Sequence, residues 1–120
     1  MDYNSRITVL VHKGNKIFYH DFSDLRADEH QWILEIGFER MLRSNPSQLF
    51  IVSNIKNTKI NDHSKQLVEG FLETLHDKRI GIKNAVFGLS AVQRVILSNV
   101  EKNTFFAADL DEALEWLTNS

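Results

Sequence analysis

Two segments with the pattern of buried strands most constrain what this chain can fold into. They are QLFIVSNI at residues 48–55 and GIKNAVFG at residues 81–88. A strand that is apolar on consecutive residues has both faces covered, which is typical of a central strand in a largely parallel sheet with helices on each side. Because a helical pattern lies between the two segments, they predict a β-α-β unit with a right-handed crossover.

Residues 6–22 (RITVLVHKGNKIFYHDF) predict an N-terminal β-hairpin. Gly14 and Asn15 suit a two-residue primed turn because both tolerate positive φ. With that turn, residues whose numbers sum to 29 face each other, and both faces of the hairpin carry large apolar groups. One face then comprises Ile7, Val9, Val11, Phe18, His20 and Phe22.

Four helical patterns follow, each with apolar residues at steps of three and four. Pro46 marks the end of the first, because proline disfavours helical backbone at the preceding residue. A short strand at residues 103–108 separates the last two. The predicted inward residues are Ile33, Leu34, Phe38, Met41 and Leu42, then Leu67, Val68, Phe71, Leu72 and Leu75, then Val92, Val95, Ile96 and Val100, and finally Leu110, Ala113, Leu114 and Leu117. The predicted order is β-β-α-β-α-β-α-β-α, an α/β fold whose mixed sheet carries packed helices.

The length of 120 residues predicts a single domain, residues 1–120. The formal charge is −2 and no segment is rich in charged residues of one sign, so nucleic acid is not expected as a partner. The longest N-terminal apolar run, Ile7–Val11, is too short for a signal-peptide core or a membrane span. With no cysteine there are no disulfides, which fits a cytoplasmic protein without stable membrane insertion.

Asp62, His63 and Ser64 are consecutive and have the residue types of a hydrolase triad. Successive helical side chains diverge by about 100°, so three neighbours cannot form the Asp–His–Ser hydrogen-bond chain. The sequence contains no G-x-S-x-G elbow, phosphate-binding glycine loop or H-x-x-x-H spacing. We therefore expect no enzyme activity, no metal and no cofactor.

Ser64 is nevertheless the best candidate for a regulatory site. Asn61 has the character of an N-cap, and Asp62 favours the helix dipole in the first turn. Ser64 follows at the carboxyl end of the strand at 48–55, where open α/β sheets place ligands. A phosphate there would meet free backbone N–H groups and add nearly two negative charges. The other interpretation is a solvated serine in a first turn, which we favour because serine is common at helix starts.

Trp116 lies at the edge of the apolar stripe of the last helix. A partly exposed tryptophan is consistent with a partner surface, including that of a homodimer. It is equally consistent with a cover over the rim of the sheet, which we favour because single apolar residues are common on surfaces.

The chain resembles the SpoIIAA-like (STAS) family, and is most similar to its small stand-alone STAS/SEC14-type proteins. The resemblance covers the whole chain and is carried by YHDFSDL, AVFGLSAVQRVILSNV and FFAADLDEALEWL. In STAS regulators a strand-end Asp precedes an Asp-Ser-Ser-Gly motif whose second Ser is phosphorylated. The resemblance aligns Asn54 with the strand-end Asp, Asp62 with the motif Asp and Ser64 with the phosphoacceptor. His63 replaces the first Ser of the motif, and Lys65 replaces its Gly.

This resemblance implies a non-enzymatic regulatory module that binds a protein partner, such as a kinase or a sigma-factor regulator. Ser64, Asp62 and Asn54 would face that partner. The second function left open is a carrier or sensor of a small apolar ligand or membrane-surface lipid, as in SEC14-like proteins. That function would need a cavity of roughly 300–1,000 Å³.

Overall fold

The computed structural model describes residues 3–59, 61–100 and 103–119, except for the side chain of Val100. Its elements in chain order are η1 (Tyr3–Arg6), β1 (Ile7–His12), β2 (Asn15–Asp21), α1 (Ala27–Arg43), β3 (Gln48–Asn54), α2 (Asp62–Asp77), β4 (Gly81–Phe87), α3 (Ala91–Val100), β5 (Thr104–Phe106) and α4 (Leu110–Thr118). Apart from the short 3₁₀ turn η1, this is the order predicted from the sequence.

The five strands form one mixed sheet in the order β1-β2-β3-β4-β5. β1 pairs antiparallel with β2, while β2, β3, β4 and β5 pair in parallel. Each parallel neighbour is reached through one helix, as a β-α-β chain requires. The predicted fold, an α/β mixed sheet with an N-terminal hairpin, is confirmed.

The register of the hairpin differs from the prediction. The turn residues are Lys13 and Gly14, with φ of 50° and 78°, and Ile7 pairs with His20, so facing numbers sum to 27. A primed turn of this kind favours glycine at its second position, which explains why Gly14 occupies it. The shift is two residues, and an even shift leaves every side chain on its predicted face.

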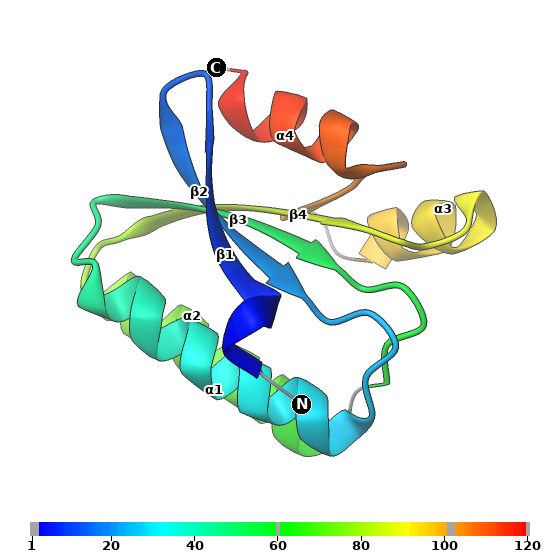
Figure 1. Cartoon of the computed structure of the whole chain (residues 1–120), viewed down its shortest axis with the longest axis horizontal. Helices are drawn as coiled ribbons and strands as arrows, with labels where there is room; N and C mark the ends of the chain where they lie inside the picture. The colour runs from blue at the N-terminus through cyan, green and yellow to red at the C-terminus, as the bar shows by residue number, and fades with distance from the viewer. Residues whose placement is uncertain (1–2, 60, 101–102, 120) are drawn as a thin grey trace.

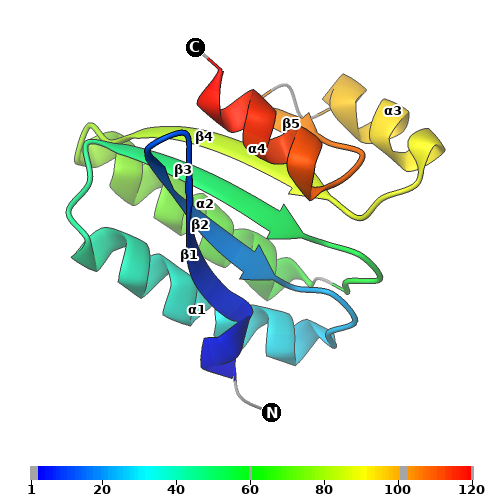
Figure 2. The ribbon, with the colours of Figure 1, turned by 45° about the horizontal axis from the view of Figure 1, so that its top comes forward.

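Two layers of helices cover the sheet, with α1 and α2 side by side on one face and α4 on the other (Figures 1 and 2). The α4 side holds a cluster built on Ile17, Val52, Ala85, Ala113 and Leu117. The α1/α2 side holds two clusters, formed by Phe18, Met41, Leu49, Ile51, Phe71 and Leu75, and by Ile7, Phe22, Leu25, Ile33 and Leu34. Because alternate side chains point to opposite faces of the sheet, the strands supply buried side chains to both helix layers.

The predicted inward face of α3 is wrong. Val92, Val95 and Ile96 are 69%, 63% and 58% exposed, and the fourth residue of the prediction, Val100, has a side chain outside those described. α3 contacts β5 at the end of the sheet and lies beyond that edge (Figure 2). Helical periodicity shows that one face is apolar, but it does not specify what covers that face.

The predicted stripe of α2 is also only partly buried. Phe71 and Leu75 are in the core, whereas Val68 and Leu72 are exposed. These two side chains border a cavity beneath β4. The uncovered parts of α2 and α3 are thus places where the described structure departs from a fully packed sheet with helices on both faces.

Candidate functional site

The carboxyl ends of the parallel strands form the edge of the sheet where open α/β proteins bind ligands. Asp21 ends β2 and Asn54 ends β3, and the register pairs these two residues. Phe87 ends β4 and pairs with Asn54 on the other side. The candidate residue Asn54 therefore lies in the middle of this edge.

The side chain of Asn54 is held in place by a hydrogen bond with the backbone. Its Oδ1 accepts a hydrogen bond from the N–H of Lys56 at 3.1 Å. Gly88, just after β4, has φ of 106°, and a Cβ there would lie 2.6 Å from Lys56 N and 3.0 Å from Asn54 Oδ1. The two strand ends approach so closely that position 88 requires glycine.

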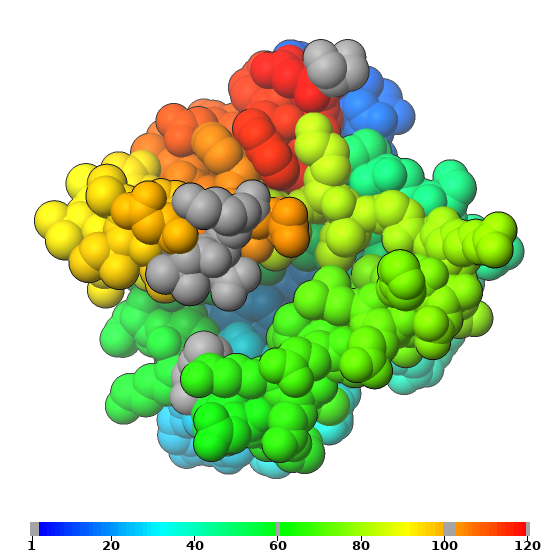
Figure 3. Space-filling model, turned by 180° about the vertical axis from the view of Figure 1, so that it is seen from behind, coloured from blue at the N-terminus to red at the C-terminus, as the bar shows by residue number. Residues whose placement is uncertain are grey.

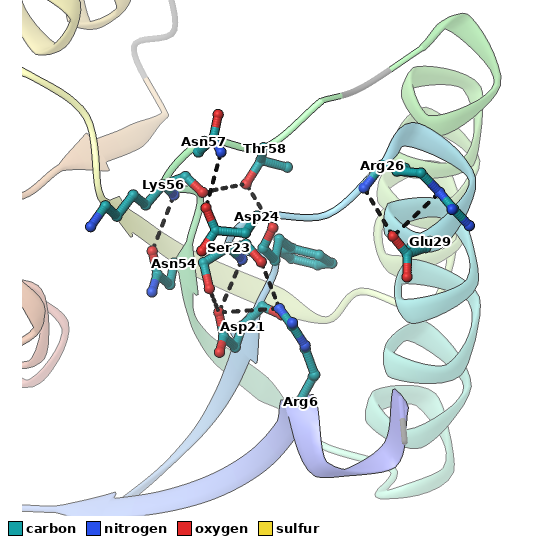
Figure 4. A network of polar contacts seen from close by, with 11 residues as sticks. Arg6, Asp21, Ser23, Asp24, Arg26, Glu29, Asn54, Lys56, Asn57 and Thr58 are labelled. Carbon is teal, nitrogen blue, oxygen red and sulfur yellow. Dashed lines mark hydrogen bonds and ion pairs between the residues drawn. The ribbon is translucent and has the colours of Figure 1, made fainter. Parts of the chain in front are cut away.

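A second polar cluster lies beside Asn54 at the end of β2 (Figure 4). The N–H and Oγ–H of Ser23 both donate to Asp21 Oδ1, at 3.0 and 2.6 Å. Arg6 donates to the carbonyl of Ser23 at 2.7 Å and lies 3.7 Å from Asp21 Oδ1. Burial, and then the charge of Asp21, raise the pKa of Tyr19. The cluster orders the loop after β2.

The loops after β2 and β3 are joined by further hydrogen bonds (Figure 4). Asn57 Nδ2 donates to Asp24 Oδ1 at 3.0 Å, and Thr58 Oγ1 donates to the carbonyl of Phe22 at 2.8 Å. Asp24 and Asn57 have φ of 60° and 50°, a conformation that these short polar residues tolerate better than most. The edge is therefore a braced polar surface.

The first turn of α2 follows this braced loop. Asn61 caps the helix as predicted, since its Oδ1 accepts from Ser64 N at 2.9 Å. Asp62 is solvent-exposed, whereas Ser64 is only 2% exposed and its Oγ has no hydrogen-bond partner. Asp62, His63 and Ser64 therefore form no triad. Among the described residues, no hydrogen bond joins Asn54 to Asp62 or Ser64.

Trp116 packs within its own chain. Its ring stacks on Phe105 with centroids 4.9 Å apart, and Lys83 Nζ lies 4.6 Å from its centroid. The same ammonium group donates to the carbonyl oxygens of Trp116, Leu117 and Asn119, at the end of α4. Trp116 thus lies half-buried against Phe105 of the edge strand β5, and its role as a partner surface stays a prediction.

Sequence reasoning missed two buried histidines, His20 on β2 and His30 on α1. Both rings pack against Phe22, with centroids 5.7 and 4.4 Å from it. Burial lowers the pKa of each to about 4, and the charge of Arg40 also lowers that of His20. Strand alternation placed His20 on an apolar face, which was the one signal that it would be buried.

The described residues contain no group of three or more His, Asp or Glu side chains able to hold a metal ion. Within the same residues, no helix combines the length and the apolar character needed to cross a membrane.

Among solved structures, the chain is similar to a serine-to-glutamate variant of RsbS from Moorella thermoacetica, with 13% sequence identity and a TM-score of 0.61. The similarity covers 95% of this chain and 96% of that chain. No protein-family model and no curated protein sequence matches the chain. RsbS is a STAS-domain protein, and the likeness extends over almost every element of both chains. The hairpin, the strand order and this likeness show that the chain has the STAS (SpoIIAA-like) fold.

Proposed function

We propose that this protein is a non-enzymatic regulatory module, a single domain that acts in the cytoplasm by binding a protein partner. The binding surface consists of the exposed face of α3 together with the adjoining edge around Asn54. The observation that carries the proposal is the exposure of three branched apolar side chains on one helix, Val92, Val95 and Ile96. Clustered apolar exposure of this kind marks surfaces that bind other proteins.

The three side chains lie on one side of α3 because they follow steps of three and four residues. Arg94 is the single charged residue in α3, so this face carries little charge to keep it in water. α3 begins three residues after Gly88, which abuts Asn54 and Lys56. The apolar face and the polar edge are thus close along the chain, and we propose that they bind the partner together.

These features define the chemistry of the partner. An amphipathic helix binds by laying its apolar side chains into a hydrophobic groove, with polar contacts around them. We therefore expect a protein that offers such a groove to α3 and hydrogen-bonding groups to the edge around Asn54 and Asp62. A second copy through Trp116 is less favoured, because that ring already stacks within the chain.

Charge placed on this face should weaken partner binding without unfolding the protein. We expect the double variant Val95→Lys/Ile96→Lys to bind the partner at least tenfold more weakly, since an apolar anchor at an interface contributes about 1–3 kcal/mol. Crosslinking in the native host followed by mass spectrometry would identify the partner, and titration calorimetry would give the Kd.

Ser98→Lys is the matched control, because Ser98 is exposed on another side of the same helix. It should leave both the Kd and the melting temperature unchanged. Equal Kd values for the double variant and the wild type would show that α3 is not the binding surface.

Ser64 supplies the proposed regulation, with a partner kinase as the modifying enzyme. Because its Oγ is buried, phosphorylation requires the first turn of α2 to open. The phosphate would then hold this turn away from the core, next to Asp62, and so change the surface offered to the partner.

A further inference from the structure

A cavity of about 620 Å³ lies between the sheet and the α1/α2 layer. Figure 3 shows the hollowed face on this side, between the green atoms of α2 and the yellow and orange atoms of the C-terminal part of the chain. Its apolar wall includes Phe38, Met41, Val68, Phe71 and Leu72. The volume is within the range of small-molecule sites, roughly 300–1,000 Å³.

The floor of the cavity is polar, although it belongs to the inner face of the sheet. The register places His20 on β2 beside Ser53 on β3, and Asn84 on β4 beside Thr104 on β5. All four line the cavity. Within the described part of the chain, none of these four side chains forms a hydrogen bond. His20 and Ser53 are buried, where polar groups normally have partners, whereas Asn84 and Thr104 are half-buried.

Two imidazoles line one part of this cavity. His20 and His30 are only 3% and 6% exposed, and each has a ring nitrogen, Nε2 and Nδ1 respectively, without a partner. Gly37 makes room for the His20 ring, since a Cβ there would lie 2.4 Å from Nε2. The low pKa of both rings, about 4, keeps them uncharged near neutral pH. Both rings are therefore uncharged, and the unpaired Nε2 of His20 faces Gly37 on α1.

The cavity lining within the described residues contains no lysine, arginine, aspartate or glutamate. A charged group placed on this floor would gain no counter-ion from the described lining, which is unfavourable for a charge that leaves water. An apolar helix, such as α3 of a second copy, would cover the mouth but leave the polar floor unpaired. A small uncharged molecule with an apolar body satisfies both surfaces.

We propose that this cavity binds an uncharged amphiphilic small molecule, with its hydroxyl or carbonyl groups on the floor formed by His20, Ser53, Asn84 and Thr104 and its apolar body against α1 and α2. Of the ligands left open by the sequence, this selects the small apolar class and excludes anionic lipids. The site is separate from the α3 face, so the protein is a ligand-binding module in addition to a partner-binding one.

The test compares 1-decanol with decanoate at pH 7.5, since the two share a chain but only decanoate is charged. Titration calorimetry should show that 1-decanol binds the intact protein at least tenfold more tightly than decanoate does. Leu72→Trp adds bulk at an exposed position that lines the cavity, and it should weaken 1-decanol binding at least tenfold. Ile96→Trp adds the same bulk at an exposed position on α3 and should leave binding unchanged.

Asn84→Leu tests the floor, because it keeps the size of the side chain and removes its hydrogen-bonding groups. We expect it to weaken 1-decanol binding several-fold. Absence of 1-decanol binding, equal binding of decanoate, or equal binding to Leu72→Trp would overturn the proposal. The proposal would also be overturned if the protein formed a concentration-dependent dimer that Leu72→Trp dissociates, because the cavity would then be covered by a second copy of the chain.

Discussion

Lowering the pH from 7.5 to 4.5 is expected to destabilise this protein strongly through His20 and His30. Their pKa in the folded state is about 4, against an ordinary value of 6.5. Below pH 6.5 the unfolded chain therefore binds protons that the folded protein does not. Stability is full above pH 6.5 and is lost as the pH falls towards 4, by about 2–3 kcal/mol for His20 and by less for His30, which is less completely buried.

Urea unfolding at a series of pH values measures this effect as a slope of the unfolding free energy against pH. His20→Gln and His30→Gln should each flatten the slope between pH 6.5 and 4.5, whatever they do to stability at pH 7.5. Ser98→Gln, at an exposed position without a titratable group, should not change it. An unchanged slope in both buried-site variants would show that these rings are solvated in solution.

The fold could be predicted because it depends on local periodicity. Strand alternation assigned Ile17 and Phe18 to opposite faces, and they are buried in separate clusters on the two sides of the sheet. The assignment survived a wrong hairpin register, since the error was an even number of residues. Capping chemistry was also predictable, as the hydrogen bond from Ser64 N to Asn61 Oδ1 confirms.

The exposed face of α3 and the cavity could not be predicted, because they depend on which element packs against each apolar face. Sequence periodicity does not specify that element. Val92, Val95 and Ile96 have the spacing of a buried stripe, yet α3 lies beyond the sheet edge. The cavity arises for the same reason, because Leu72 of α2 has no opposing helix in the described structure. Strand order was enough to place Asn54 at the carboxyl edge of the sheet, but the burial of Ser64 depends on tertiary packing.

The second large effect is expected at Ser64. Ser64→Asp places a carboxylate at a buried position without a counter-ion, next to the acidic Asp62. We expect a loss of about 3–5 kcal/mol in unfolding free energy, because an unpaired buried charge costs far more than the 0.3–1 kcal/mol that a helix dipole returns. Ser64→Ala removes a hydroxyl without a partner and should be neutral or stabilising by up to about 1 kcal/mol.

His63→Asp is the matched control, since it adds the same charge one residue away at an exposed position. It should change the unfolding free energy by less than about 0.5 kcal/mol. Hydrogen exchange should show faster exchange of the backbone amides of residues 64–68 in Ser64→Asp only. A phosphate at Ser64 would then act by opening the start of α2, because the closed helix has no room for it. If Ser64→Asp costs no more than His63→Asp, Ser64 is accessible in solution, and a phosphate there would act only as an added surface charge.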